Sequence, residues 1–179
     1  MTESHSSEQP AELEDFLLLQ RLAQRISSIL DLDDLLEQIV EDVAQTFGYT
    51  RSAVLLLDEE ADEVIIAAVR GWTSNYHAKG ERFKISEGMI GEAVRTQKTC
   101  YAPDVTQNPN YMVSEATTRS EVDIPIIVRG KPIGVFNAQH PETRGFPSYR
   151  VRLLEALAGH IGVAIENARL FERERREKE

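Results

Sequence analysis

The chain lacks the features of an extracellular or membrane protein. A single cysteine, Cys100, among 179 residues allows no internal disulfide and no cage of thiolates around a metal. The longest apolar run, Val64 to Val69, has six residues, whereas a membrane-spanning helix needs about 20. The first ten residues are polar and acidic, unlike a secretory signal. We therefore expect a cytoplasmic protein with no membrane partner.

An excess of positive charge is also missing. The net charge is −10, and proteins bind phosphate backbones through grouped lysines and arginines, so we expect no nucleic-acid partner. Residues 1–48 hold 11 acids and 2 bases, whereas residues 141–179 hold 7 acids and 8 bases. Because both ends read as long helices, we expect an acidic first helix and a slightly basic last helix to lie side by side.

The length and composition fit one folded domain. The chain is 41% hydrophobic and 28% charged, which is ordinary for a globular protein with a sizeable core. We expect a disordered acidic tail over residues 1–12 and a domain over 13–172. The charged segment 173–179 is expected to be the end of a helix or the start of a linker.

Apolar residues recur at helical spacing at both ends of the chain. The first helix has two apolar rows, and Asp33 or Asp34 is expected to cap a second helix that ends at Gly48. The last helix starts at Pro147 or Ser148 and carries one stripe from Leu154 to Phe171 and a second of Ala156, Val163 and Leu170. One sheet face cannot bury both stripes, so we expect a homodimer through the terminal helices, parallel or antiparallel. The alternative is that the second stripe meets the chain's own first helix.

The middle of the chain reads as two antiparallel strand pairs. These are Ser52–Leu57 with Val64–Val69, and Glu121–Val128 with Ile133–Gln139. An irregular stretch from Gly71 to Asn110 separates them and contains a helix over Met89–Thr96 and a strand near Thr99–Ala102. This order predicts an α+β fold with an antiparallel sheet of five or six strands.

Four parts of the second half of the chain carry a family resemblance. They are Ser120–Ile126, the segment Val128–Asn137 with its glycine turn, Phe146, and Ala164–Phe171. Together they resemble a GAF domain, a small-molecule-binding regulatory domain of bacterial signalling proteins, over about residues 16–171. The resemblance implies that the N- and C-terminal helices cover one face of the sheet. It places a ligand pocket under loops and short helices on the other face.

Alternation along the second strand pair predicts the floor of this pocket. If the loop is the three residues Arg129 to Lys131, Asp123 faces Asn137, Glu121 faces Gln139 and Ile127 faces Ile133. The opposite side is wholly apolar and suits the helices. Two acids and two amides on one face supply the convergent polar groups of a pocket, with Glu121 at its edge. The alternative is that this end of the sheet is merely solvated.

The irregular middle supplies further candidates. Its aromatic residues and Met112 either close over a flat ligand or anchor loops. Gly88 and Gly91 open a helix whose free amides suit an anion, or they allow a tight entry and close packing. The candidate ligand-binding residues are therefore Glu121, Asp123, Asn137, Gln139, Trp72, Tyr76, Tyr111 and Met112.

The sequence shows no evident set of catalytic or metal-binding side chains. The histidines have no metal-ligand spacing to Cys, Asp or Glu, and Cys100 is expected to be a small buried residue. Among GAF-like enzymes, the free methionine sulfoxide reductases resemble the run from Gly88 to Val122 and share Glu121. This chain differs from them at four positions, with Ile90 and Ser114 in place of cysteines and Asn137 and Gln139 in place of aspartates. We therefore expect no enzyme, no catalytic residue and no metal, and the sequence points to no particular cofactor.

These observations leave three functional hypotheses. The first is a non-catalytic sensory or regulatory GAF domain that binds a small molecule of unknown identity. It would transmit a conformational change through the terminal helices of a homodimer to an output domain. The second is a dimerisation or spacer module with no physiological ligand, and the third is an enzyme like the free methionine sulfoxide reductases.

Overall fold

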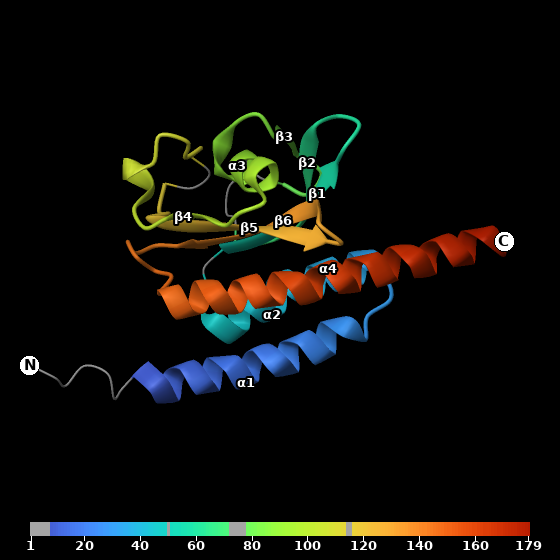
Figure 1. Ribbon diagram of the computed structural model, residues 1–179, viewed down its shortest axis with the longest axis horizontal. Coiled ribbons are helices and arrows are strands. Elements are labelled where there is room, and N and C mark those ends of the chain that lie inside the picture. Colours follow the sequence, from blue (N-terminus) through green and yellow to red (C-terminus); the bar gives the residue numbers. More distant parts are fainter. Residues whose placement is uncertain (1–7, 50, 72–77, 114–115) are drawn as a thin grey trace, which may run out of the picture.

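A six-stranded antiparallel sheet forms the middle layer of the molecule (Figure 1). The computed structural model describes residues 8–49, 51–71, 78–113 and 116–179. The strand order is β3-β2-β1-β6-β5-β4. The strands are β1 (Arg51–Asp58), β2 (Glu63–Arg70), β3 (Arg82–Lys84), β4 (Cys100–Ala102), β5 (Ser120–Val128) and β6 (Lys131–His140). The predicted α+β class and antiparallel sheet are confirmed.

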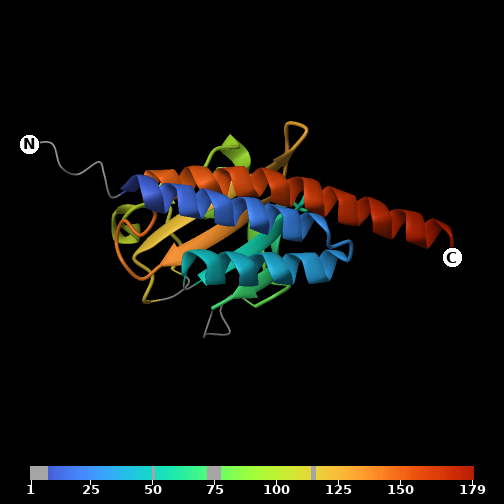
Figure 2. The same cartoon turned by 90° about the horizontal axis from the view of Figure 1, so that it is seen from below.

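Three long helices lie on one side of this sheet (Figures 1 and 2). α2 (Leu32–Phe47) and α4 (Ser148–Glu177) pack against the strands. α1 (Glu8–Ser27) lies outside them, beside α4 and running in the same direction. The short helix α3 (Gly88–Thr96) and the 3-10 helix η1 (Val105–Gln107) belong to the other side. The prediction that both terminal helices share one face is therefore confirmed.

The apolar stripes read from the sequence form the core between helices and sheet. The strands contribute their helix-facing side chains, and α1, α2 and α4 contribute one stripe each. The central members are at most 2% exposed: Leu19, Ile26, Leu35, Ile39, Ile124, Ile126, Phe136, Leu154, Leu157 and Ile161. Burial of each large side chain contributes on the order of 1.5 to 3 kcal/mol, so this layer dominates the stability of the fold.

The helix ends differ in part from the sequence prediction. Asp31 caps α2 by accepting a hydrogen bond from the amide of Asp34 at 2.9 Å. The prediction of Asp33 or Asp34 as the cap is thus wrong, because both lie inside the first turn, where acids favour the helix dipole. Gly48 ends α2 with φ 72°, as predicted.

The outer limits of the terminal helices also extend beyond the expected domain. α1 begins at Glu8, so residues 8–12, which were expected to belong to the tail, are helical. α4 continues to Glu177, through most of the charged segment 173–179. Across the described residues, the helices lack an apolar stretch long enough to pass through a bilayer.

Asp15 and Arg150 join the acidic first helix to the last helix. The Nε atom of Arg150 donates a hydrogen bond to Oδ2 of Asp15 at 3.0 Å. Its Nη1 atom donates to the carbonyl oxygen of Phe47, the last residue of α2, at 3.3 Å. One guanidinium therefore connects all three long helices, and the expected side-by-side placement of the two ends is confirmed.

The turn between β5 and β6 is shorter than predicted. Val128 pairs with Lys131, which leaves the two residues Arg129 and Gly130 in the loop. Their φ angles are 51° and 76°. Two successive positive φ angles are typical of the type I′ turn that suits a two-residue hairpin.

A bulge on β6 compensates for the shorter turn. Ile126 pairs with Gly134 but Ile127 pairs with Pro132, so Ile133 is the extra residue. Proline has no N–H to donate to the ladder, which favours a bulge at this position. The predicted contact of Ile127 with Ile133 is therefore wrong, while the register beyond the bulge is the predicted one.

Candidate functional site

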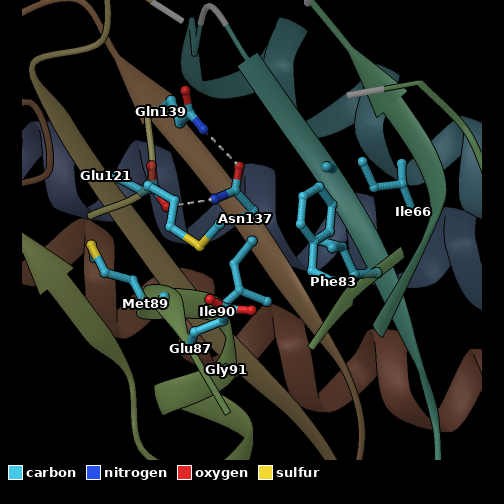
Figure 3. Close-up of a pocket in the computed structure, with 13 residues that line it drawn as sticks. Ile66, Phe83, Glu87, Met89, Ile90, Gly91, Glu121, Asn137 and Gln139 are labelled. Carbon is cyan, nitrogen blue, oxygen red and sulfur yellow. Dashed lines mark hydrogen bonds between the residues drawn. The ribbon is translucent and has the colours of Figure 1, made fainter. Parts of the chain in front are cut away.

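Two polar cross-strand pairs lie on the sheet face away from α2 and α4. Glu121 is opposite Gln139, and Asp123 is opposite Asn137. Figure 3 shows Glu121, Asn137 and Gln139 gathered on β5 and β6 above the sheet. The predicted parity of this cluster is correct, because the bulge restores the register that a two-residue turn alone would have shifted.

Asn137 connects the two carboxyl groups. Its Nδ2 atom donates a hydrogen bond to Oδ1 of Asp123 at 2.7 Å and another to Oε1 of Glu121 at 3.1 Å. The Nε2 atom of Gln139 in turn donates to Oδ1 of Asn137 at 3.4 Å (Figure 3). A single side-chain amide therefore fixes the position of both acids.

The network continues to a buried arginine that the sequence reading missed. Oγ1 of Thr118 donates to Oε1 of Gln139 at 2.7 Å, and Nη1 of Arg51 donates to the same hydroxyl at 2.8 Å. Arg51 is only 8% exposed and lies opposite Gln139 on β1. A charged residue at the first position of an otherwise apolar strand was the sequence signal that could have indicated this buried role. The guanidinium is thus connected to the acids through a hydroxyl and two amides.

Burial alters the ionisation of the two acids. Glu121 is 4% exposed and Asp123 is fully buried. Desolvation raises the pKa of Asp123 to about 6, although its hydrogen bonds with Glu121 and Asn137 lower it. Desolvation, followed by the charge of Asp123, raises the pKa of Glu121 well above its ordinary value. The pair therefore resists double ionisation near neutral pH.

A small cavity opens above this floor, between the sheet and α3 (Figure 3). Its volume is about 60 Å³, on the scale on which one buried water needs about 10 to 15 Å³. The lining is mainly apolar, with acids and amides at the floor: Ala53, Leu55, Ile66, Phe83, Glu87, Gly88, Met89, Ile90, Gly91, Met112, Glu121, Asn137 and Gln139. This combination suits a compact ligand with an apolar body and a polar group.

Close packing explains one of the two glycines at the start of α3. A Cβ atom on Gly91 would lie 2.4 Å from the carbonyl oxygen of Ile85, which is too close for any side chain. Gly88 has φ 74°, and a Cβ atom there would lie 2.8 Å from Sδ of Met112. Of the two explanations for these glycines, tight entry and close packing has the direct structural support.

The structure separates the predicted site residues into groups. Glu121, Asn137, Gln139 and Met112 line the cavity. Glu121, which was expected at the edge of the pocket, is 4% exposed and lies in the cavity floor, where α3 packs against β5 and β6. Asp123 is not among the lining residues, and its carboxyl group accepts a hydrogen bond from Asn137, which is.

The aromatic candidates have other positions. Tyr111 packs against the small cluster of Met89, Ala102 and Val105 and does not line the cavity, so it is an anchor of its loop. Trp72 and Tyr76 lie outside the described residues. Phe83, which does line the cavity, was missed because its three-residue strand carries no alternation to assign a face.

Cys100 lies on the same sheet face, opposite Asp123 on β4. It is half-buried, and desolvation followed by the negative charges of Glu92 and Asp123 raises the pKa of its thiol to about 12. The thiol is therefore protonated at neutral pH. Within the described ranges, no group of three or more His, Cys, Asp or Glu side chains has an arrangement suited to a metal ion.

Comparison with known proteins assigns the family. The sequence model of the GAF domain matches residues 14–166, and the chain therefore belongs to the GAF domain family. It is 32% identical to the free methionine-R-sulfoxide reductase of Saccharomyces cerevisiae over 79 residues, which are 44% of each protein. It is 24% identical over 172 residues to the Nif-specific regulatory protein of Azospirillum brasilense, covering 90% of this chain and 27% of that protein. The chain thus spans less than half the length of each of these relatives.

Solved structures share the fold at lower identity. The GAF domain of a phosphoenolpyruvate-protein phosphotransferase from Coxiella burnetii has a TM-score of 0.83 at 20% identity, covering 90% of this chain and 98% of that one. The free methionine-R-sulfoxide reductase of Neisseria meningitidis, solved with its substrate, has a TM-score of 0.80 at 22% identity, covering 95% and 97%. At these identities the likeness establishes the fold.

The prediction that the chain is not an enzyme is contradicted by these comparisons. Free methionine-R-sulfoxide reductases, which are enzymes with a GAF fold, occur among both the relatives and the solved structures. The prediction relied on the lack of an evident catalytic set, on Ile90 and Ser114 in place of cysteines, and on Asn137 and Gln139 in place of aspartates. Because one fold carries both regulators and enzymes, missing motif residues do not by themselves exclude catalysis. Ile90 lines the cavity, and Ser114 lies outside the described residues.

Proposed function

We propose that this GAF domain binds a small molecule with an amino group and a compact apolar body, and that it is the sensory part of a regulatory protein. One observation carries the proposal. The carboxyl group of Glu121 is buried in the cavity floor, and no donor among the described residues reaches its Oε2 atom. A buried acceptor without a donor costs free energy that a ligand N–H would recover.

The remaining lining and the regulatory relatives support the same function. An apolar wall of Leu55, Ile66 and Phe83 faces the polar floor, so a ligand with one cationic end and one apolar end matches both. The similarity to the Azospirillum regulator extends along nearly the whole chain, which favours a regulatory role over a purely structural one.

Paired compounds test the proposal. Free methionine and free methionine sulfoxide are the first amines to try, because the yeast relative is named for the second. Each is compared with its N-acetyl form, which keeps the apolar body and loses the cationic amine. We expect the free amines to raise the thermal midpoint and the acetylated forms to leave it unchanged. Equal shifts with both forms would refute an amine-binding site.

Reduction of free methionine-R-sulfoxide is the second candidate function, favoured by the sequence similarity and by Cys100 on the pocket face. In that reaction the Cys100 thiol would reduce the sulfoxide, so that its sulfur takes the oxygen and becomes a sulfenic acid while methionine is released. An added dithiol then reduces the sulfenic acid back to the thiol with loss of water. Turnover in wild type that Cys100→Ser abolishes would assign this activity. Binding of the sulfoxide without turnover would assign the sensor.

We also propose that a second copy of the chain covers the outer surface of α1 and α4. Leu13, Phe16 and Leu17 of α1 are 60%, 46% and 48% exposed, and Val163 and Leu170 of α4 are 57% and 50% exposed. α4 extends past the sheet, and both helices lie on the outside of the molecule (Figure 2). A run of large apolar side chains along adjacent helices is typical of an interface. The excess of acids in the first quarter and of bases in the last adds charge complementarity between copies.

A further inference from the structure

Glu121 and Asp123 form a buried acid pair with one shared donor. They are two residues apart on β5, so their side chains leave the same face of the sheet. Asn137 uses one amide nitrogen to bond Oε1 of Glu121 and Oδ1 of Asp123. No donor from the described part of the chain reaches the second oxygens, Oε2 and Oδ2. A hydrogen bond between two carboxyl groups requires a proton on one of them.

We propose that Glu121 and Asp123 share one proton in the ligand-free protein, and that a cationic ligand displaces this proton when it binds. The proposal rests on the amine-binding function and adds its regulation, since ligand affinity becomes a function of pH. Glu121 lines the cavity while Asp123 lies behind it, so the ligand meets the pair from the Glu121 side.

The surroundings of the pair favour the form that carries one proton over the form in which both carboxyl groups are ionised. Both acids are desolvated, and each lies within the field of the other, which raises the pKa of Glu121 strongly. β6 faces them with the amides of Asn137 and Gln139. The other charged or titratable side chains placed toward this face by α3, β4 and β1 are Glu87, Glu92, Arg95, Cys100 and Arg51. Among the described residues, no hydrogen bond or ion pair joins a cation directly to either acid, and Arg51 reaches them only through Thr118 and the two amides.

The carboxylic acid O–H bond breaks and its proton passes to solvent. The ammonium group of the ligand keeps all its protons and donates hydrogen bonds to the carboxylate oxygens. The pair changes from a single negative charge to two, and the ligand cation compensates the added one. A neutral ligand of the same shape has no such compensation and leaves the proton in place.

The shared proton is tested in the ligand-free protein. Carbon-13 NMR of labelled Asp and Glu carboxyl groups is recorded across a pH titration of wild type, Asp123→Asn and Glu121→Gln. We expect one carboxyl group to remain protonated near neutral pH in wild type. We expect neither single variant to show it, because the new amide donates to the remaining carboxylate. Glu37→Gln removes an exposed carboxyl on α2 and should leave the signal intact. Two ionised carboxyls near neutral pH would overturn the proposal.

The displacement is tested by calorimetry with free methionine and free methionine sulfoxide as probes. Each titration is run in two buffers of different ionisation enthalpy near neutral pH. We expect release of about one proton per bound amine in wild type and none in Asp123→Asn, with wild-type affinity falling about tenfold for each unit of decreasing pH. Binding without proton release would overturn the displacement and leave the binding function standing. A protonated pair that binds neither amine would refute the binding function and with it the displacement.

Discussion

Asn137 and Asp123 lie directly opposite each other on β6 and β5, and the Asn137 amide donates to the Asp123 carboxyl at 2.7 Å. The same amide nitrogen also serves Glu121. The position of both acids in the cavity floor therefore depends on hydrogen bonds from one neutral side chain.

Substitution of Asn137 by leucine should destabilise the protein in a pH-dependent way. Leucine keeps the volume but removes the donor from two buried acids, at a cost of about 1 to 3 kcal/mol. The loss should be larger at alkaline pH, where both carboxyls are ionised, than near neutral pH, where their shared proton lets them bond each other. Urea unfolding at both pH values measures it. Gln45→Leu, on the exposed side of α2, is the matched control and should change little.

The acid pair should also make wild-type stability fall as pH rises. Asp123 has a folded-state pKa of about 6 against an ordinary 3.8. The folded state therefore holds more protons than the unfolded state between those values, and its stability declines by about 1.4 kcal/mol per pH unit there. Unfolding free energies measured across this window should show the decline in wild type relative to Asp123→Asn. Parallel pH profiles for the two proteins would contradict the raised pKa.

Two glycine substitutions should have opposite effects. In Gly91→Ala the new Cβ would lie 2.4 Å from the Ile85 carbonyl oxygen, so α3 must move, at a cost of about 1 to 3 kcal/mol. Gly159→Ala, inside α4, meets nothing within 4 Å and should stabilise by about 0.5 to 1 kcal/mol. Thermal unfolding of both variants measures the difference. Equal effects would show that α3 is not tightly seated over the cavity.

The helix surface gives a prediction about association. Val163→Glu and Leu170→Glu place a charge on the exposed side of α4, where a second copy is proposed to pack. We expect a wild-type dimer in sedimentation at micromolar concentration and monomers for both variants, because burying each side chain contributes roughly 1.5 kcal/mol or more. Val113→Glu, an exposed valine on the cavity side, should remain dimeric. A wild-type monomer would eliminate the dimer.

The periodicity of apolar residues predicted the sheet and the helix layer, whereas the pairing of Asp123 with Asn137 also depended on an assumed three-residue turn. Success at the hairpin depended on two differences that cancel. The turn has two residues where three were expected, and Ile133 bulges out of β6. A bulge leaves no simple signature in apolar alternation, although Pro132 hints at one.

The depth of Glu121 and the roles of Arg51 and Phe83 were not predictable in the same way. Alternation assigns a face of the sheet but says nothing of what covers it. The cover comes from α3 and the segments around it, whose place depends on close contacts such as that of Gly91 with Ile85. Arg51 acquires its role through Thr118, a partner 67 residues away in the sequence.

The most direct test of the account is the affinity of one free amine for wild type and for Glu121→Gln, measured by calorimetry near neutral pH. A charge-assisted hydrogen bond contributes roughly 1.5 to 3 kcal/mol, so the account predicts binding about ten to a hundred times weaker in the variant. Glu37→Gln should bind like wild type. Equal affinity of wild type and Glu121→Gln would contradict the proposal that this buried carboxyl holds the ligand.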